Sequence, residues 1–154
     1  MVTYRKFQFG WFIVCVFVIV IVFMTLGYIY QWGNSPIDIY SYIFFMTLLG
    51  LILLSFYGLT VVVNEEDVKI IFGIGLFTKK IKLHAVRSTS IVKYPVFAGY
   101  GIRFVQNGIL YNVNGTEAVE LKLTGKRDII LIGTDDAENL KNAIGKHLGS
   151  KHTI

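Results

Sequence analysis

The sequence contains little cysteine and proline, and its first 64 residues contain almost no charge. Cys15 is the only cysteine and lies inside an apolar run, which excludes an internal disulfide and a metal site of several cysteines within one chain. No charged residue occurs between Lys6 and Asp38, or between Asp38 and Glu65. The chain is 54% hydrophobic, above the roughly 45–50% of soluble proteins, and its apolar residues are concentrated in these two uncharged stretches.

Each uncharged stretch is long enough to cross a membrane as a helix. One helix is predicted over about residues 9–30 and a second over about 39–59. About 20 apolar residues span a hydrocarbon core of roughly 30 Å, and a backbone in lipid must satisfy its own hydrogen bonds. A cleaved signal peptide has a shorter apolar core and a small-residue cleavage site, which Tyr28-Ile29-Tyr30 does not provide. Residues 1–63 are therefore predicted to form a transmembrane hairpin.

The loop between the two helices predicts a helix start and an orientation. Ser35 suits a cap, Pro36 suits the first helical position, and Asp38 completes an approximate capping box. The loop contains no Lys or Arg, whereas Arg5 and Lys6 precede the first helix. Because cations accumulate in cytoplasmic loops, we expect both termini in the cytoplasm of a multi-pass cell-membrane protein.

From residue 64 onward the hydrophobic pattern predicts a strand-rich domain that reaches residue 154. Apolar and polar residues alternate, which is typical of half-buried antiparallel strands. Asn107-Gly108 and Asn114-Gly115 are favoured two-residue hairpin turns, because both central positions accept positive φ. We predict a meander of seven or eight strands, at about 59–63, 67–73, 77–83, 87–93, 100–106, 109–113, 117–123 and 128–132.

The end of the chain predicts one amphipathic helix, over about residues 136–148. Leu140, Ile144 and Leu148 recur at helical spacing, and the preceding Asp135-Asp136 pair suits a helix cap better than a metal site or an acid–base pair. The helix must bury its apolar stripe against the strands. The sequence therefore predicts an α+β membrane protein, with a helical hairpin followed by a barrel-like meander that one helix closes.

Several short motifs between residues 59 and 148 follow one another at a distinctive spacing. They are Asp67 to Gly73, Ile81-Lys82-Leu83 with Val86, Gly99-Tyr100-Gly101-Ile102-Arg103, Gly108 with Tyr111, and Ile132-Gly133-Thr134-Asp135-Asp136. Their order resembles the bacterial pleckstrin-homology-like (PH-like) domains of small membrane proteins, often found after a two-helix hairpin. Ala137 departs from the pattern, since similar sequences often have proline there. The resemblance implies a fold and a location, and no reaction.

Residue types that carry catalysis or bind cofactors form no recognisable pattern. His84, His147 and His152 lack the spacing of metal ligands, and no motif pairs any of them with a serine or with Cys15. Gly99-Tyr100-Gly101 precedes a strand, whereas a phosphate-binding P-loop precedes a helix and carries Lys-Ser/Thr. We therefore expect a non-enzymatic protein without catalytic residues, metal or cofactor.

A group of cations is the candidate binding surface for lipid or a partner. Near an anionic leaflet each such cation contributes about 1 kcal/mol, although an ordinary solvated strand face is the alternative. An arginine after a glycine turn can bind a carboxylate or phosphate, or pair with an acid of its own domain. The candidate residues are Lys79, Lys80, Lys82, Arg87 and Arg103.

These observations favour a binding or scaffold module that acts at the cytoplasmic membrane surface through a protein partner or self-association. Two alternatives stay open, namely sensing of anionic lipid headgroups through the basic strand face, and a role as accessory subunit of a membrane complex or transporter. The net charge of +5 is too mild to favour nucleic acid. We also expect residues 64–154 to fold without the hairpin.

Overall fold

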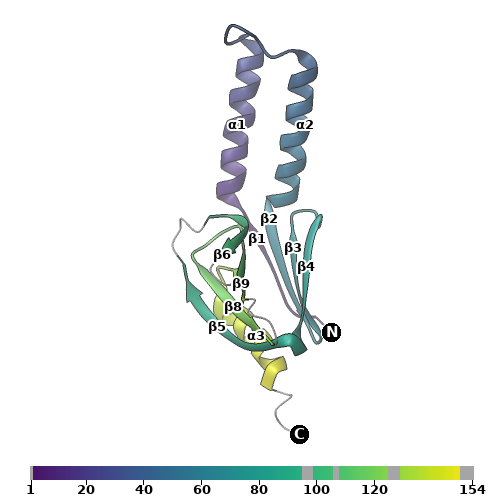
Figure 1. The fold of residues 1–154 in the computed structure, drawn as a ribbon, viewed down its shortest axis with the longest axis vertical. Coiled ribbons are helices and arrows are strands. Elements are labelled where there is room, and N and C mark those ends of the chain that lie inside the picture. Colours follow the sequence, from purple (N-terminus) through teal and green to yellow (C-terminus); the bar gives the residue numbers. More distant parts are fainter. Residues whose placement is uncertain (1, 95–98, 106–107, 125–128, 150–154) are drawn as a thin grey trace.

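Two antiparallel helices stand on a body made of two sheets and a third helix (Figure 1). The computed structural model describes residues 2–94, 99–105, 108–124 and 129–149. The order of elements confirms the prediction of two apolar helices followed by strands and a final helix. The helices are α1 (Trp11–Ile29), α2 (Ile39–Phe56), a short 3-10 turn η1 (Leu83–Ala85) and α3 (Ala137–Gly149).

The strands form one four-stranded and one five-stranded sheet. The first sheet is antiparallel, in the order β1-β2-β3-β4, and the second has the order β5-β8-β9-β7-β6. The first contains β1 (Val2–Phe9), β2 (Gly58–Asn64), β3 (Asp67–Phe72) and β4 (Phe77–Lys82). The second contains β5 (Val86–Lys93), β6 (Gly101–Val105), β7 (Gly108–Asn112), β8 (Glu117–Leu123) and β9 (Ile129–Gly133).

Strand β1 is an element that the sequence analysis missed. It pairs with β2 along its length, from Val2 opposite Asn64 to Phe9 opposite Gly58. The four-stranded sheet therefore contains residues from both sides of the helical hairpin, and the chain has more strands than the seven or eight predicted. Inner-face and outer-face side chains alternate along residues 2–9 as in any strand, but Lys6 and Gln8 on the inner face are polar. Because the inner face is not apolar, the hydrophobic pattern does not indicate a strand here.

The two sheets do not close into a barrel, which corrects the predicted architecture. Strand β9 lies between β7 and β8, antiparallel to β8 and parallel to β7. The predicted hairpin through Asn114-Gly115 is therefore wrong, although Gly115 does adopt a positive φ of 90°. The other predicted turn falls partly on Asn107, which lies outside the described residues. Alternation predicts that a segment is a strand, but it does not predict which strand lies beside it.

The core lies between the sheets and beneath α3. Leu59, Val61 and Val63 of β2 are buried against the corresponding residues of β3, and α3 contributes Leu140 and Ile144. Fully burying side chains of this size stabilises a fold by about 1.5–3 kcal/mol each. The helix packs on β5, β8 and the far end of β1, so it covers one side of the body.

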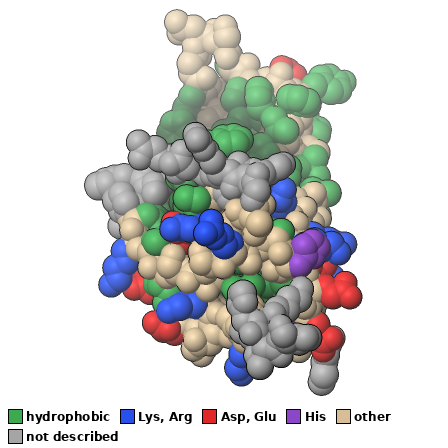
Figure 2. Space-filling model, turned by 60° about the horizontal axis from the view of Figure 1, so that its bottom comes forward, with side chains coloured by type: hydrophobic (Ala, Val, Ile, Leu, Met, Phe, Trp, Pro, Cys, Tyr) green, Lys and Arg blue, Asp and Glu red, His purple; other side chains and the backbone are tan. Residues whose placement is uncertain are grey.

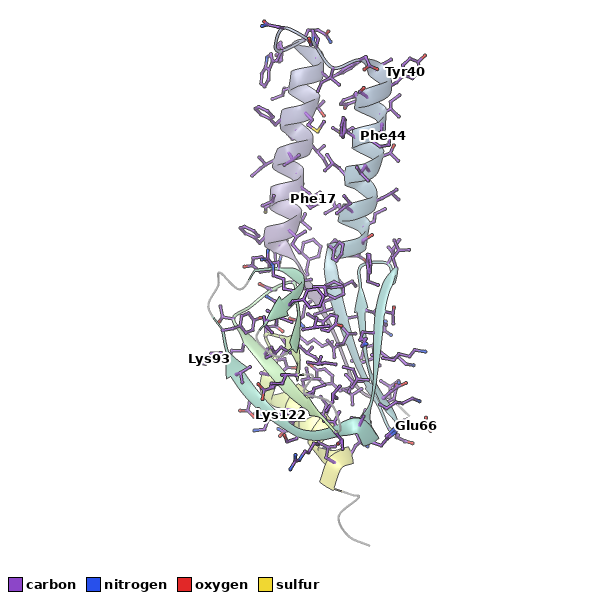
Figure 3. The ribbon with its side chains drawn as sticks, in the orientation of Figure 1. Phe17, Tyr40, Phe44, Glu66, Lys93 and Lys122 are labelled. Atoms are coloured by element: carbon purple, nitrogen blue, oxygen red, sulfur yellow. The ribbon has the colours of Figure 1, made fainter. Side chains whose placement is uncertain are left out.

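The two long helices stand clear of this core, and both are long and apolar enough to cross a membrane. Along the described residues of α1 and α2 only Ser55 is buried, and its hydroxyl donates to the carbonyl of Leu51. Phe17, Tyr40 and Phe44 are among the side chains that line the hairpin, whereas charged residues such as Lys93 lie in the body (Figure 3). Helices that are apolar all round and uncovered by protein are typical of membrane spans.

The cap of α2 differs from the prediction, whereas the first residue of the helix agrees with it. The helix begins at Ile39, and its cap is Asp38 rather than Ser35. One carboxylate oxygen of Asp38 accepts from the backbone N–H of Tyr40 at 2.9 Å and of Ser41 at 3.1 Å. Hydrogen bonds from the Ser41 hydroxyl and backbone hold the pKa of Asp38 below its usual value. Asp38 is the better cap because its carboxylate accepts several donors at once.

Candidate functional site

The helical hairpin joins the body through two very short connections. Only Gly10 separates β1 from α1, and only Tyr57 separates α2 from β2. The backbone N–H of Gly10 donates to the carbonyl of Tyr57 at 2.8 Å, so the two connections are bonded to each other. The body is therefore held at a fixed position relative to the helices instead of hanging on a linker.

The β3–β4 turn is fastened to the last turn of α2. The N–H of Ile74 donates to the carbonyl of Leu54 at 3.2 Å, and the N–H of Gly73 donates to Gly58 at 2.8 Å. Gly73 has a positive φ of 49°, and a Cβ there would collide with the carbonyl of Leu54, so only glycine fits. Ile74 is 60% exposed beside the helix base, as is Leu76 at 63%.

The opposite side of the helix base meets the start of β6. The ring of Tyr100 stacks on Phe12, in the first turn of α1, with centroids 4.9 Å apart. Asn112 of β7 donates from its side chain to the carbonyl of Gly99 at 3.3 Å. The edge strands β4 and β6 of the two sheets face each other across a seam. On both sides of this seam, described residues contact the base of the long helices.

A groove runs along this seam, from the helix base toward the far end of the body. Its larger part, the lower cavity, has a volume of about 620 Å³ and lies between β4 and the strands β6, β7 and β9. Phe104 shares the inner strand face with Ile102, yet it is 87% exposed because none of the described strands covers the seam. The apolar lining of the lower cavity includes Ile81, Phe104, Ile109, Tyr111, Leu123 and Ile130.

A smaller part, the upper cavity, lies at the helix end of the same groove. It has a volume of about 230 Å³, and Lys79 is its charged lining residue. Phe77, in its wall, stacks on Phe56 at the end of α2, with centroids 5.2 Å apart. Burial raises the pKa of Tyr111, whose ring lines both cavities. The apolar lining of the upper cavity includes Ile70, Phe72, Leu76, Phe77 and Ile102.

The three lysines of β4 lie on different faces of the strand. Lys79 is the cross-strand partner of the fully buried Ile70, so it belongs to the inner face, whereas Lys80 is opposite Lys69 on the outer face. Lys82 shares the outer face with Lys80. Within the described part of the chain, no carboxylate forms an ion pair with any of the three. Figure 2 shows Lys and Arg side chains, in blue, spread over the body below the apolar helices.

The other two predicted binding residues lie apart from these lysines. Arg87 is on β5, at the opposite edge of the five-stranded sheet from β6. Arg103 is on the outer face of β6, where its Nε donates to the carbonyl of Tyr100 at 3.5 Å. The structure therefore brings Lys79, Lys80 and Lys82 to one groove, and Arg87 and Arg103 lie outside it. A binding role for the two arginines stays a prediction.

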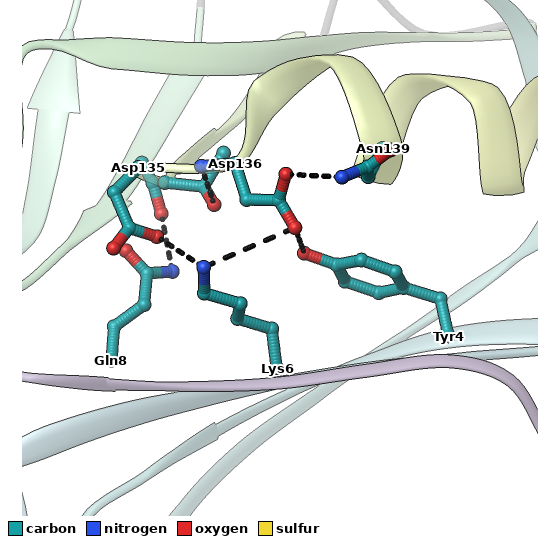
Figure 4. Close-up of polar contacts among 8 residues, drawn as sticks. Tyr4, Lys6, Gln8, Asp135, Asp136 and Asn139 are labelled. Carbon is teal, nitrogen blue, oxygen red and sulfur yellow. Dashed lines mark hydrogen bonds and ion pairs between the residues drawn. The ribbon is translucent and has the colours of Figure 1, made fainter.

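A second polar cluster fastens β1 to the start of α3 (Figure 4). Asp136 accepts from the Tyr4 hydroxyl at 3.1 Å and from the side-chain amide of Asn139 at 2.7 Å. Lys6 lies 3.1 Å from Asp135, and the side chain of Gln8 donates to the carbonyl of Gly133 at 3.1 Å. Burial, followed by the charge of Asp136, raises the pKa of Tyr4. The aspartates that open α3 thus also hold the N-terminal strand, which sequence reasoning missed.

The histidines occupy unrelated places. His84 lies at the rim of the lower cavity, His147 is 2.9 Å from the Thr3 hydroxyl, and His152 lies outside the described residues. Among the residues that the structure describes, no group of three or more His, Cys, Asp or Glu side chains is placed to hold a metal ion. The groove is therefore the strongest candidate site.

Comparison of the chain with protein-family models, with curated proteins and with solved structures gives no match. The PH-like resemblance therefore rests on the order of motifs and elements in this chain alone.

Proposed function

We propose that this protein is a non-enzymatic, membrane-anchored PH-like binding module that holds a protein partner at the cytoplasmic surface of the cell membrane. The observation that carries the proposal is the uncovered lower cavity, where Phe104 stands exposed beside apolar walls and lysines. Exposed aromatic side chains at the edge of an apolar cavity are frequent anchors of protein interfaces. Because the hairpin fixes the groove near the bilayer, a partner in the same membrane meets it at high effective concentration.

The element order supports the PH-like assignment. Two facing sheets precede a single C-terminal helix that packs against them. The chain departs from a simple closed meander in two ways. The seam between β4 and β6 is open, and the first strand, β1, precedes the two long helices. The open seam is the feature that makes a binding site available.

The proposed orientation rests on two independent observations. The loop between the helices lacks Lys and Arg, whereas Arg5 and Lys6 lie on β1. Strands β1 and β2 pair, so the two ends of the hairpin lie on the same side of the membrane.

In a Cys15→Ala background, Ser35→Cys should react with an impermeant thiol reagent on intact cells, and Lys93→Cys should react only after lysis. The reverse pattern would place the body outside.

The partner proposal is tested by crosslinking in native membranes. A photo-reactive phenylalanine analogue at position 104 of the full chain should form an adduct with one protein, whereas the same analogue at position 93, on the exposed edge of β5, should not. Lys80→Glu together with Lys82→Glu should reduce the adduct, because both lysines line the same cavity. Equal adducts at positions 104 and 93, or adducts with lipid alone, would contradict the proposal.

The lysines of β4, which pair with no carboxylate of the described residues, favour sensing of anionic lipid headgroups as a second candidate function, since juxtamembrane cations are attracted to an anionic leaflet. An accessory role in a membrane complex has support only in the exposed apolar surfaces of α1 and α2, which a neighbouring helix would cover.

A further inference from the structure

The upper cavity differs from the lower one in its position relative to the bilayer. Its wall residue Phe77 packs on Phe56 at the end of α2, and the neighbouring turn is bonded to the last turn of that helix. A strand advances about 3.3 Å per residue, so Lys79 lies about 7 Å beyond Phe77. The headgroup layer of each leaflet is about 5–8 Å thick. With the end of α2 at the boundary of the hydrocarbon core, Lys79 lies within the headgroup layer, which contains the lipid phosphates.

The charge of the upper cavity is unbalanced. Lys79 is on the inner face of β4, and the residues that line the cavity include no carboxylate. An ammonium group beside apolar walls, without an acidic partner among the described residues, favours an anion that brings its own apolar portion. A free phosphate would satisfy the charge alone, whereas an amphiphile would also cover Leu76 and Ile102.

The cavity also lies beside the place from which such an amphiphile would come. Ile74 and Leu76 are exposed beside the helix base, and no strand in the part of the chain that the structure describes bridges the seam between β4 and β6. A lipid can therefore enter the seam with its chains still in the bilayer. The volume of about 230 Å³ suits a phosphate and the adjoining part of a lipid rather than a whole molecule.

We propose that the upper cavity binds the phosphate and adjoining glycerol and acyl portion of an anionic phospholipid from the surrounding bilayer, with Lys79 as the phosphate ligand. The site adjoins the lower cavity assigned to a protein partner and shares Lys79 and Tyr111 with it, but its ligand is a lipid and not the partner. It also differs from a diffuse basic surface, because the inward-facing Lys79 acts and the outward-facing Lys80 does not.

Adjacent lysines on opposite strand faces supply a matched pair of variants. The full chain is purified in mild detergent, dioleoylphosphatidylglycerol or dioleoylphosphatidylcholine is added, and native mass spectrometry counts the lipids retained. The wild type should retain phosphatidylglycerol in preference. Lys79→Gln should weaken this retention about tenfold, as expected for loss of a charge-assisted hydrogen bond, and Lys79→Arg should restore most of it. Lys80→Gln should change it less than twofold.

The cavity itself is tested without altering any charge. Ile102→Trp fills the upper cavity from β6 and should reduce retention of phosphatidylglycerol, while thermal unfolding of the variant shows that the body is intact. Equal losses for Lys79→Gln and Lys80→Gln would replace the site with a diffuse surface, and no lipid preference in the wild type would overturn it. If Lys79 serves only the protein partner, Lys79→Gln will reduce crosslinking at position 104 and leave lipid retention unchanged, which also overturns the lipid site.

Discussion

Single residues of β1 carry much of the attachment between the two ends of the chain. Tyr4 and Lys6 reach the carboxylates of Asp135 and Asp136, and Gln8 reaches the carbonyl of Gly133 (Figure 4). The side-chain oxygen of Gln8 has no partner among the described residues, although the residue is 3% exposed. The hydroxyl of Tyr4 is the most informative of these groups, because its pKa is raised by its burial and by its contact with Asp136.

Tyr4→Phe should destabilise the body by about 1.5–3 kcal/mol at neutral pH, since it removes a hydrogen bond to a charged group. Burial and Asp136 raise the folded-state pKa of Tyr4, so this stabilisation is complete below the ordinary tyrosine pKa of about 10 and is lost as pH rises through the raised value. Hydrogen exchange of β1 and α3 amides in the full chain measures the difference between wild type and variant.

The matched control for this prediction is Tyr40→Phe, because Tyr40 is 82% exposed on the hairpin. It should leave exchange in β1 and α3 unchanged at every pH. If Tyr4→Phe and the wild type show the same protection at neutral pH, the contact between Tyr4 and Asp136 contributes nothing to the attachment.

At the scale of elements, long apolar runs and alternation predicted most boundaries closely. The helices predicted over 9–30 and 39–59 extend over Trp11–Ile29 and Ile39–Phe56, and α3 begins one residue later than predicted. The second helix ends earlier because Gly58 already pairs with β1. Pairing between distant segments cannot be predicted from local periodicity, which is why the insertion of β9 was missed, whereas β1 was missed because its inner face is polar.

The candidate site could be predicted only in part. The lysines of β4 stand out in the sequence, and the alternation of Phe77, Lys79 and Ile81 would have placed Lys79 on the apolar face. The groove could not be predicted, because it depends on which strand lies opposite β4. The exposure of Phe104 likewise follows from the unclosed seam, and nothing in its own strand pattern indicates it.

At the scale of the whole molecule, the hairpin is an insertion between two paired strands. A chain of residues 64–154 lacks β1 and almost all of β2, and with them the buried Leu59, Val61 and Val63. The pairing of β1, β2 and β3 in one sheet argues against our expectation that this part folds alone. We expect it to aggregate or to lack cooperative thermal unfolding, because β3 is left with an exposed edge and an open core.

A chain from which the helical hairpin is deleted provides the control for this prediction. Phe9 and Gly58 are paired neighbours, so a short glycine–serine loop can join residues 2–9 directly to residues 58–149. This chain should be soluble and should unfold cooperatively, as measured by circular dichroism. Cooperative unfolding of residues 64–154 would show that β1 and β2 are dispensable.

The pairing of β1 with β2 also sets an order of events during synthesis. Residues 2–9 leave the ribosome before either long helix, and they cannot pair until residues 58–64 have followed. If only one helix inserted across the bilayer, β1 and β2 would lie on opposite sides of it, and the four-stranded sheet could not form. If the helices cross a bilayer, the four-stranded sheet can therefore form only after both have inserted, and a chain with one inserted helix leaves β1 and β2 unpaired.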